Sequence, residues 1–363
     1  MDKDSKIYVA GHRGLVGSAI VRNLQQKGYT NIIGRSHAEM DLTDSRAVEA
    51  FFESERPEYV FLAAAKVGGI MANSLYRADF ILINLQIQNN IIAASHRYGV
   101  RKLMFLGSSC IYPKMAPQPM TEDCLLTGEL EYTNEPYALA KISGIRLCES
   151  FNIQHNTNYI AVMPTNLYGP NDNYDLEKSH VLPAMIRKMH LGHALEENRW
   201  SDIRRDLTAR PVEGIGGDAS DDEILSVLNK YGLVREGSNV VLNLWGTGTP
   251  LREFLHSDDM ADACVFLMEH VDFKDIVGER QMKEIRNTHI NIGSGTELTI
   301  SDLANKVKNI VGFRGTIRWD ASKPDGTPRK LMDVSRLARL GWTYRITLDE
   351  GIDSVYRNYV SRL

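Results

Sequence analysis

The chain has 363 residues, of which 43% are hydrophobic and 24% are charged, the composition of a folded protein with room for two domains. A formal net charge of −4 gives no general attraction to nucleic acid or to an anionic membrane, and neither partner is expected. No apolar run approaches the ~18 residues that span a bilayer, and the first apolar segment is too short for a signal peptide. The four cysteines lack CxxC spacing, so we expect no metal site and no disulfides, and we expect a cytoplasmic protein.

The first half of the chain alternates short apolar runs with longer segments of helical period, which is typical of βαβ units. We predict strands at Lys6–Ala10, Asn31–Gly34, Tyr59–Ala63, Lys102–Leu106 and Tyr159–Met163. We predict helices near Val16–Lys27, Ser45–Arg56, Phe80–Tyr98 and Tyr137–Asn156. The expected fold class is α/β, with a Rossmann-type doubly wound parallel sheet and a smaller C-terminal mixed α/β lobe that binds substrate.

A glycine-rich loop, GHRGLVG from Gly11 to Gly17, joins the first strand to the first helix. Glycines let the backbone turn tightly, let a pyrophosphate approach the amides, and let the helix pack close to the strand. The helix N-terminus then favours the negative charge of a phosphate. An ordinary turn is the alternative, but the position at the first strand-to-helix junction indicates a dinucleotide site.

The end of the second strand indicates which dinucleotide is bound. A site selective for NAD normally has an acid there, which bonds the ribose 2′-hydroxyl. No acid occurs in Ile33-Gly34-Arg35-Ser36-His37, and Arg35, with Arg13, can pair with a 2′-phosphate. The sequence therefore predicts NADP(H), unless Arg35 is only a solvated surface charge.

Tyr137 and Lys141 are four residues apart on one predicted helix and so share a face. An ammonium beside a phenol stabilises the phenolate, and we expect it to lower the pKa of Tyr137 toward neutrality for acid-base work. A YxxxK spacing alone is usually an accident of helix surfaces. After a dinucleotide loop and the serine-rich strand end Gly107-Ser108-Ser109, it indicates a reductase.

The pattern changes after Asn166, so we place a Rossmann domain at 1–178, with a return segment near 251–293, and a substrate lobe at 179–363. An insertion near 195–239 is expected to be a solvated excursion or an interface element, with a helix at Asp221–Tyr231. Further strands are predicted at Val240–Trp245 and His289–Ile292, the latter returning to the first sheet. Helices are predicted at Ser301–Val311 and Val334–Leu340.

Seven motifs along almost the whole chain carry a family resemblance. They lie at 11–17 (GHRGLVG), 63–70 (AAAKVGGI), 107–113 (GSSCIYP), 134–138 (NEPYA), 163–170 (MPTNLYGP), 252–256 (REFLH) and 323–330 (KPDGTPRK). With them the chain resembles the extended short-chain dehydrogenase/reductases, and within these the GDP-L-fucose synthase family. The insertion is roughly forty residues longer than the common short form of that family.

The resemblance implies C3 and C5 epimerisation of a GDP-4-keto-6-deoxy sugar, followed by reduction at C4 with hydride from NADPH. Ser108 would hydrogen-bond the C4 oxygen, Tyr137 would protonate it, and Lys141 would support the tyrosine and bind the nicotinamide ribose. Cys110 and His180 would be the base and the acid of epimerisation. Without the resemblance, Cys110 reads as a small buried hydrophobe and His180 as a structural histidine.

The resemblance also implies binding residues and a homodimer. The cofactor-binding residues would be Gly11, Arg13, Gly14, Leu15, Val16, Gly17, Arg35, Asp41, Leu42, Leu106, Gly107, Lys141, Pro164, Asn166, Leu167 and His180. The GDP-sugar would contact Lys188, Trp245, Arg252 and Asp325, although Trp245, ending an apolar strand, reads equally well as a core aromatic. The dimer would form through the helices near Phe80–Tyr98 and Tyr137–Asn156.

Three other functions remain open at this point. A nucleotide-sugar 4-epimerase would keep its NAD bound and would need no Cys-His pair. A 4,6-dehydratase typically needs an Asp-Glu pair where Ser109-Cys110 stands here. A dinucleotide-sensing module without activity would not need Ser108, Tyr137 and Lys141.

Overall fold

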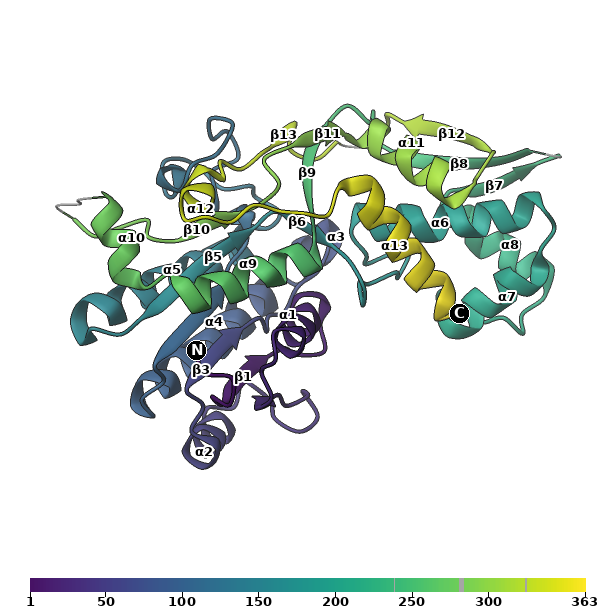
Figure 1. Ribbon diagram of the computed structural model, residues 1–363. Coiled ribbons are helices and arrows are strands. Elements are labelled where there is room, and N and C mark those ends of the chain that lie inside the picture. The colour runs from purple at the N-terminus through teal and green to yellow at the C-terminus, as the bar shows by residue number, and fades with distance from the viewer. Residues whose placement is uncertain (238, 281–283, 324) are drawn as a thin grey trace. The chain divides into compact units, whose positions relative to one another are not determined.

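Figure 1 shows the computed structural model, which describes residues 1–237, 239–280, 284–323 and 325–363. Pro324, part of the 323–330 motif, lies outside the described residues. The chain divides into two compact units, each built from three segments. Unit 1 comprises Met1–Leu167, Glu253–Thr296 and Leu331–Arg345, and unit 2 comprises Tyr168–Arg252, Glu297–Lys330 and Ile346–Leu363.

Unit 1 contains a six-stranded sheet in which every pair of neighbouring strands is parallel. Its order is β10-β5-β4-β3-β1-β2, with β1 at Ile7–Ala10, β2 at Ile32–Ile33, β3 at Tyr59–Leu62, β4 at Lys102–Leu106, β5 at Tyr159–Pro164 and β10 at Ile290–Ile292. The predicted doubly wound sheet is confirmed. So is the return of the chain to it, since Ile290 pairs with Val162.

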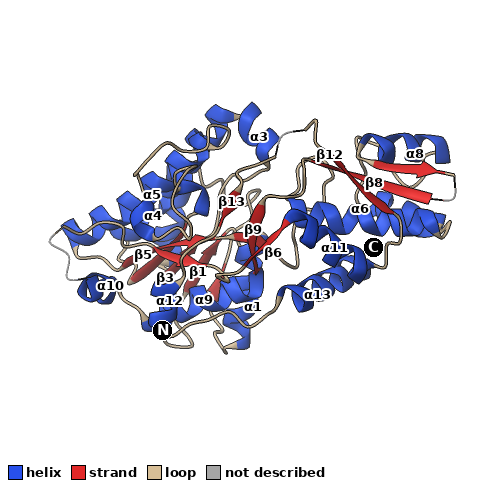
Figure 2. Cartoon of the chain, turned by 90° about the horizontal axis from the view of Figure 1, so that it is seen from above, coloured by secondary structure: helices blue, strands red, loops and turns tan. Residues whose placement is uncertain are grey.

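Successive side chains of these strands point to opposite faces of the sheet and pack in two separate apolar cores, one on each face. Ile7 and Val9 pack with α1 (Leu15–Gln26) and α9 (Ser257–His270). Tyr8 and Ala10 pack with α2 (Ser45–Glu55), α4 (Arg77–Arg97) and α5 (Glu135–His155). Figure 2 shows α1 and α9 on one side of the strands and α4 and α5 on the other. Because both faces are covered, the strands are mostly apolar, as parallel sheets require, and Lys102 of β4 and Asn291 of β10 are buried polar exceptions.

Helix α5 approaches the sheet closely at Gly144. A Cβ atom there would lie 2.3 Å from Cζ of Phe105 on β4. We therefore expect Gly144→Ala to displace the Phe105 ring and to lower the free energy of unfolding by about 1 to 3 kcal/mol, despite the better helix propensity of alanine. Urea unfolding measures this change. Gly278→Ala, on α10 (Phe273–Arg280) with no atom within 4 Å of the new Cβ, is the matched control and should be neutral or slightly stabilising.

The third segment of unit 1 was assigned to the substrate lobe from the sequence. It carries α12 (Ser335–Arg339), which confirms the predicted helix, but it packs on unit 1. Met120 N donates to Leu331 O at 2.8 Å, and Asp333 N donates to Met120 O at 2.9 Å. The buried carboxylate of Glu253 accepts from Met332 N at 3.1 Å. These long-range backbone bonds, which local patterns do not encode, attach the segment to unit 1.

Unit 2 contains a three-stranded sheet of order β12-β8-β7, with β7 at Leu233–Glu236, β8 at Asn239–Trp245 and β12 at Thr316–Asp320. Its long helices are α6 (Val181–Glu196), α7 (Trp200–Ala209), α8 (Asp221–Lys230), α11 (Ile300–Val311) and α13 (Leu348–Ser361). The predicted helices at 221–231 and 301–311 are confirmed as α8 and α11. Unit 1 also contains the short elements α3 (Ile70–Leu75), η1 (Ser109–Ile111) and η2 (Glu122–Cys124). The remaining short strands of the chain are β6 (Asn166–Tyr168), β9 (Leu251–His256), β11 (Glu297–Thr299) and β13 (Arg329–Lys330).

The insertion near 195–239 forms α7, α8 and β7 and is part of the core of unit 2. Asp206 of α7 is fully buried, where its carboxylate accepts two hydrogen bonds from Arg187 of α6, at 2.9 and 2.8 Å, and one from the hydroxyl of Tyr359 on α13. Buried charges in a protein interior are stable only when they are paired in this way. The expectation of a solvated excursion is therefore wrong for this part of the chain.

Candidate active site

The glycine loop has the geometry that a pyrophosphate cradle needs. Gly11 has φ of +83°, and a Cβ atom on Gly17 would lie 2.1 Å from the carbonyl oxygen of Gly11, so α1 starts in direct contact with the loop. Gly14 caps α1 without a side-chain hydrogen bond, and the first turn of the helix contains no acid. Of the other predicted residues, Arg13 lies in the loop before Gly14, and Leu15 and Val16 are the first two residues of α1. The start of α1 thus fits a phosphate group.

Arg35 follows β2 and already has an anionic partner. Its guanidinium donates to Glu55 Oε1 at 2.7 Å and to the carbonyl of Gly34 at 2.9 Å, and lies 5.3 Å above the Phe51 ring. The sequence pattern did not reveal Glu55, which lies 20 residues further along the chain. A 2′-phosphate must therefore compete with this carboxylate for Arg35.

Two other features occur at this strand end. His12, which the sequence analysis did not select, packs its ring so close to Gly34 that a Cβ there would lie 2.5 Å from it. Burial, with Arg13 and then Arg35, lowers the pKa of His12. Its place in the glycine loop was the signal that could have found it. Predicted residue Asp41 accepts from the amide and hydroxyl of Thr43, which lower its pKa, and Leu42 packs on the core of unit 1.

The strand end of β4 presents the serine-cysteine turn. A Cβ atom on Gly107 would lie 2.2 Å from the terminal methyl of Met163, so a larger residue there would displace the end of that side chain. Ser108 caps η1, and its hydroxyl accepts from the amide of Cys110 at 3.4 Å. The ammonium of Lys141 donates to the carbonyl of Leu106 at 2.8 Å. The lysine of α5 is thereby fixed to the strand that carries the turn.

Tyr137 and Lys141 lie on one face of α5, whose first turn contains Pro136, a residue suited to helix starts. The Lys141 ammonium is 5.7 Å from the centre of the Tyr137 ring and 4.9 Å from that of Phe105. Phe80 contacts the Tyr137 ring edge to face at 6.2 Å. Lys141 is 3% exposed, while Tyr137 keeps part of its surface open to solvent.

The pKa of Tyr137 differs from the expectation. Burial raises it, and the neighbouring Cys110 raises it further, whereas we expected Lys141 to lower it. Burial also lowers the pKa of Lys141 to about 8, partly opposed by Cys110. Burial therefore sets the direction of the Tyr137 pKa shift, and the ammonium of Lys141 bonds the carbonyl of Leu106 rather than the phenol. Since α5 packs against η1, the phenol and ammonium of α5 and the thiol of Cys110 lie in one region of unit 1. Together they offer a proton donor, a cation and a potential base.

The end of β5 contributes the other predicted cofactor residues of unit 1. Pro164 is the last residue of β5, and Leu167 packs against the core that contains α1 and α9. The side-chain amide of Asn166 donates to the carbonyl of Glu253 at 2.8 Å. These residues follow the carboxyl end of a parallel strand, where such sheets bind ligands.

Two of the predicted residues of unit 2 lie on α6. His180 is the N-cap residue of this helix and is exposed, so it is not a buried structural histidine. Lys188 lies two turns further on and is half-buried, and burial lowers its pKa to about 8. An anionic ligand bound to Lys188 would offset the free-energy cost of partly burying its ammonium group.

The other predicted residues of unit 2 lie around the end of β8. Trp245 is 66% exposed, which excludes the core-aromatic alternative, and the ammonium of Lys323 lies 5.6 Å from its ring centre. Asp325 accepts from the amide and hydroxyl of Thr247 at 2.9 and 2.7 Å. Burial lowers the pKa of Arg252, partly opposed by Asp325. The structure thus brings an exposed indole and two cations to one loop region.

Among the described residues, no helix is long and apolar enough to cross a membrane. Nor does this part of the chain contain three or more His, Cys, Asp or Glu side chains grouped to hold a metal ion.

Comparisons with known proteins agree with this geometry. GDP-L-fucose synthase 1 of Arabidopsis thaliana is 51% identical over 362 residues, which cover 100% of this chain and 95% of the relative. A solved GDP-6-OMe-4-keto-L-xylo-heptose reductase of Campylobacter jejuni is 42% identical with a TM-score of 0.92, covering 100% of this chain and 99% of its own. A GDP-mannoheptose C4 reductase of the same organism with NADP bound is 42% identical with a TM-score of 0.85, covering 99% of each chain.

The model of the NAD dependent epimerase/dehydratase family matches residues 7–210 and 213–293, which include the glycine loop, the serine-cysteine turn and the Tyr137-Lys141 pair. The chain therefore belongs to the NAD dependent epimerase/dehydratase family, as the relatives at about 50% identity over its full length also show.

Proposed function

We propose that this protein converts GDP-4-keto-6-deoxy-D-mannose to GDP-L-fucose, by epimerisation at C3 and C5 followed by NADPH-dependent reduction at C4. The observation that carries the proposal is the packing of η1, which holds Cys110, against α5, which holds Tyr137 and Lys141. Reduction of a ketone needs only the tyrosine and the lysine. Epimerisation also needs a base, which the nearby thiol of Cys110 can supply. The names of the full-length relatives from Arabidopsis thaliana and Escherichia coli, both GDP-L-fucose synthases, support it.

Epimerisation would use the acidity that the C4 carbonyl gives to the C3 and C5 protons. The thiolate of Cys110 would take such a proton, and the electron pair of the C–H bond would move to the C4 oxygen to form an enolate. Ser108 and Tyr137 would donate hydrogen bonds to that oxygen. His180 would return a proton on the opposite face of the ring, which inverts the centre.

Reduction would then need one proton donor, since NADPH supplies a hydride to C4 when bound. Tyr137 would give its proton to the C4 oxygen. Burial keeps the pKa of this phenol high, so Tyr137 is protonated at neutral pH and ready to act as an acid. Lys141, with a pKa of about 8, is mostly cationic at neutral pH and would stabilise the phenolate that remains.

The nucleotide half of the substrate would be held by unit 2. Lys188 and Arg252 offer positive charge to the diphosphate, and Arg252 can bind two phosphate oxygens at once. The exposed ring of Trp245 and the carboxylate of Asp325 offer stacking and hydrogen bonding to guanine.

We infer NADP(H) as the cofactor, because Arg35 and Arg13 replace the acid of NAD-selective sites and because the GDP-mannoheptose C4 reductase of Campylobacter jejuni has NADP bound.

Arg35→Ala should raise the KM for NADPH by roughly 10- to 100-fold, as expected for loss of a charged hydrogen bond of about 1.5 to 3 kcal/mol, and leave the KM for NADH almost unchanged. Steady-state kinetics with both cofactors measure this. Arg101→Ala, which breaks another surface pair, with Glu58 at 3.1 Å, is the control. Equal changes for the two cofactors would contradict the role of Arg35.

A second candidate function is the reduction of a GDP-4-keto-heptose. It is favoured by the TM-score of 0.92 and the near-complete mutual coverage with the heptose reductase of Campylobacter jejuni. Both functions use Ser108, Tyr137 and Lys141, and they differ in the sugar that unit 2 must accept.

NADPH oxidation with GDP-4-keto-6-deoxy-D-mannose and with a GDP-4-keto-heptose, at equal concentrations, distinguishes the two functions. NMR of the products gives the configuration at C3, C4 and C5. A kcat/KM at least tenfold higher for the mannose derivative, with GDP-L-fucose as the product, is the expected result. The reverse preference would replace the proposal with the second candidate.

We also propose that the protein is a cytoplasmic homodimer. The four cysteines are all free and buried, which is usual in a reducing compartment. Helices α4 and α5 pack on each other and still expose Leu82, Leu139 and Ile153, apolar side chains that a dimer interface would cover. Sedimentation equilibrium tests the dimer, because it distinguishes the mass of a dimer from the 40.9 kDa of a monomer.

A further inference from the structure

The turn that carries Cys110 is held weakly by its own backbone. Ile111 N donates to Ser108 O at 3.3 Å and Tyr112 N to Ser109 O at 3.5 Å, both longer than the usual 2.9 to 3.0 Å. Cys110 N reaches Ser108 Oγ at 3.4 Å. The attachments at the two ends of the turn therefore contribute to the position of the thiol.

The first end of the turn is attached to the sheet. Gly107 N donates to Val162 O at 2.8 Å, which continues the pairing of β4 with β5. The carbonyl of Leu106 accepts from Lys141 at 2.8 Å. Ser108 is next to these anchors, and its position therefore does not depend on the second end.

The second end is attached by Tyr112, which is 3% exposed. Its hydroxyl donates to Asn291 Oδ1 at 2.5 Å and lies 3.0 Å from Nε2 of His289. Asn291 belongs to β10 and is itself held by three further bonds: its amide nitrogen donates to Glu122 Oε1 at 3.1 Å, and its side-chain nitrogen to the carbonyls of Met120 at 3.0 Å and Asp333 at 3.1 Å.

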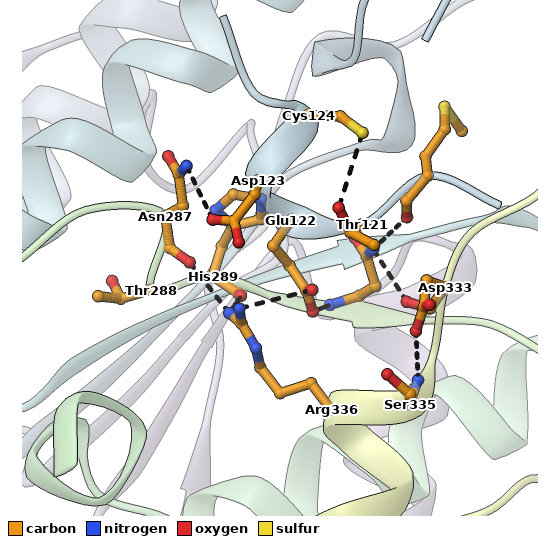
Figure 3. A network of polar contacts seen from close by, with 12 residues as sticks. Thr121, Glu122, Asp123, Cys124, Asn287, Thr288, His289, Asp333, Ser335 and Arg336 are labelled. Atoms are coloured by element: carbon orange, nitrogen blue, oxygen red, sulfur yellow. Dashed lines mark hydrogen bonds and ion pairs between the residues drawn. The ribbon is translucent and has the colours of Figure 1, made fainter. Parts of the chain in front are cut away.

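Surrounding buried polar groups support this anchor with further hydrogen bonds and an ion pair. Figure 3 shows Arg336 between Glu122 and the backbone that carries Asn287 and His289. The guanidinium donates to the carbonyls of Asn287 at 3.0 Å and His289 at 2.6 Å and lies 3.6 Å from Glu122 Oε2. Arg336, Glu122, Asn287 and His289 are all buried, so water cannot replace a hydrogen bond that this network loses. Each such loss therefore lowers the free energy of unfolding.

We propose that Tyr112 is a positioning residue for Cys110: its buried hydroxyl fixes the far end of the catalytic turn to Asn291 and thereby sets the place of the epimerisation base. The inference rests on the proposed function only in giving Cys110 the role of base. Because Ser108, Tyr137 and Lys141 have separate anchors, loss of the Tyr112 hydroxyl affects proton abstraction much more than hydride transfer.

Tyr112→Phe tests the inference, with two readouts in the full-length protein. The first is the ratio of solvent-deuterium incorporation at C3 and C5, measured with NADP⁺ in D₂O, to the rate of NADPH oxidation. We expect this ratio to fall at least about fivefold, within the ~10²-fold that a misplacement of 1 Å can cost. The second is alkylation of Cys110 by iodoacetamide, followed by mass spectrometry, which needs no turnover. We expect it to be several times faster than in the wild type, while Cys124, Cys148 and Cys264 react as before.

Tyr159→Phe is the matched control, since Tyr159 is equally buried on β5 and its hydroxyl has no hydrogen-bond partner among the described residues. A purely structural effect would lower the melting temperature of Tyr112→Phe and reduce exchange and hydride transfer equally. Unchanged alkylation of Cys110, or an exchange ratio equal to that of Tyr159→Phe, would overturn the inference. Exchange that persists in Cys110→Ser would instead overturn the proposed base, while the alkylation readout would still report on Tyr112.

Discussion

Replacing Tyr137 by phenylalanine is expected to lower kcat for NADPH oxidation by roughly 10²-fold or more, the usual contribution of a general acid. The phenyl ring fills the same space against Phe80, so the fold and the binding of NADPH should not change. Only the proton that the C4 oxygen needs is lost. Since Tyr137 has a raised pKa in the structure, the wild-type rate should not fall as the pH rises from 6 to 8 through loss of this proton.

Stopped-flow NADPH oxidation measures the loss, and fluorescence titration measures cofactor binding. Tyr132→Phe is the matched control, because Tyr132 precedes the same helix and is 72% exposed. Turnover within a few-fold of wild type in Tyr137→Phe would remove this residue from the mechanism.

Cys110→Ser should separate the two reactions. A serine hydroxyl has a far higher pKa than a thiol and cannot act as a base near neutrality. Solvent-deuterium incorporation at C3 and C5 should therefore fall by roughly 10²- to 10⁴-fold. Hydride transfer should continue, because Ser108, Tyr137 and Lys141 remain, and the product should be a GDP-6-deoxy sugar that retains the C3 and C5 configuration of the substrate.

NMR of the keto sugar in D₂O with NADP⁺ measures the exchange, and NMR of the reduced product gives its configuration. Cys124→Ser is the control: Cys124 is also buried, and serine can keep its contact with the Thr121 hydroxyl. GDP-L-fucose formation at the wild-type rate by Cys110→Ser would show that another residue is the base.

The fold of unit 1 could be predicted from local patterns because its strands are buried on both faces. The apolar runs at Tyr59–Leu62 and Lys102–Leu106 and the return strand at Ile290–Ile292 are visible in the sequence for that reason. The segment Leu331–Arg345 could not be placed, since it is attached by hydrogen bonds from Met332 and Asp333 to residues far away in the chain.

In the candidate site, too, local spacing could be predicted from the sequence and long-range contacts could not. Spacing alone placed Tyr137 and Lys141 on one helix face, and the structure has them there. The sign of the Tyr137 pKa shift could not be derived from spacing, because burial raises this pKa and burial depends on tertiary contacts such as that with Phe80. The pairing of Arg35 with Glu55 and the attachment of Tyr112 to Asn291 depend on tertiary contacts between separate segments.

The division of unit 1 into three chain segments has a consequence for synthesis on the ribosome. The first segment ends at Leu167, but Asn291, the partner of Tyr112, and Arg336, which supports it, come much later. At about 5 to 20 residues per second, roughly 10 to 35 s pass between translation of Leu167 and of Arg345. For the first part of that interval, until β10 (Ile290–Ile292) is translated, β5 is an open sheet edge. The nascent chain therefore acquires its dinucleotide loop early and its fixed cysteine turn only near the end of translation.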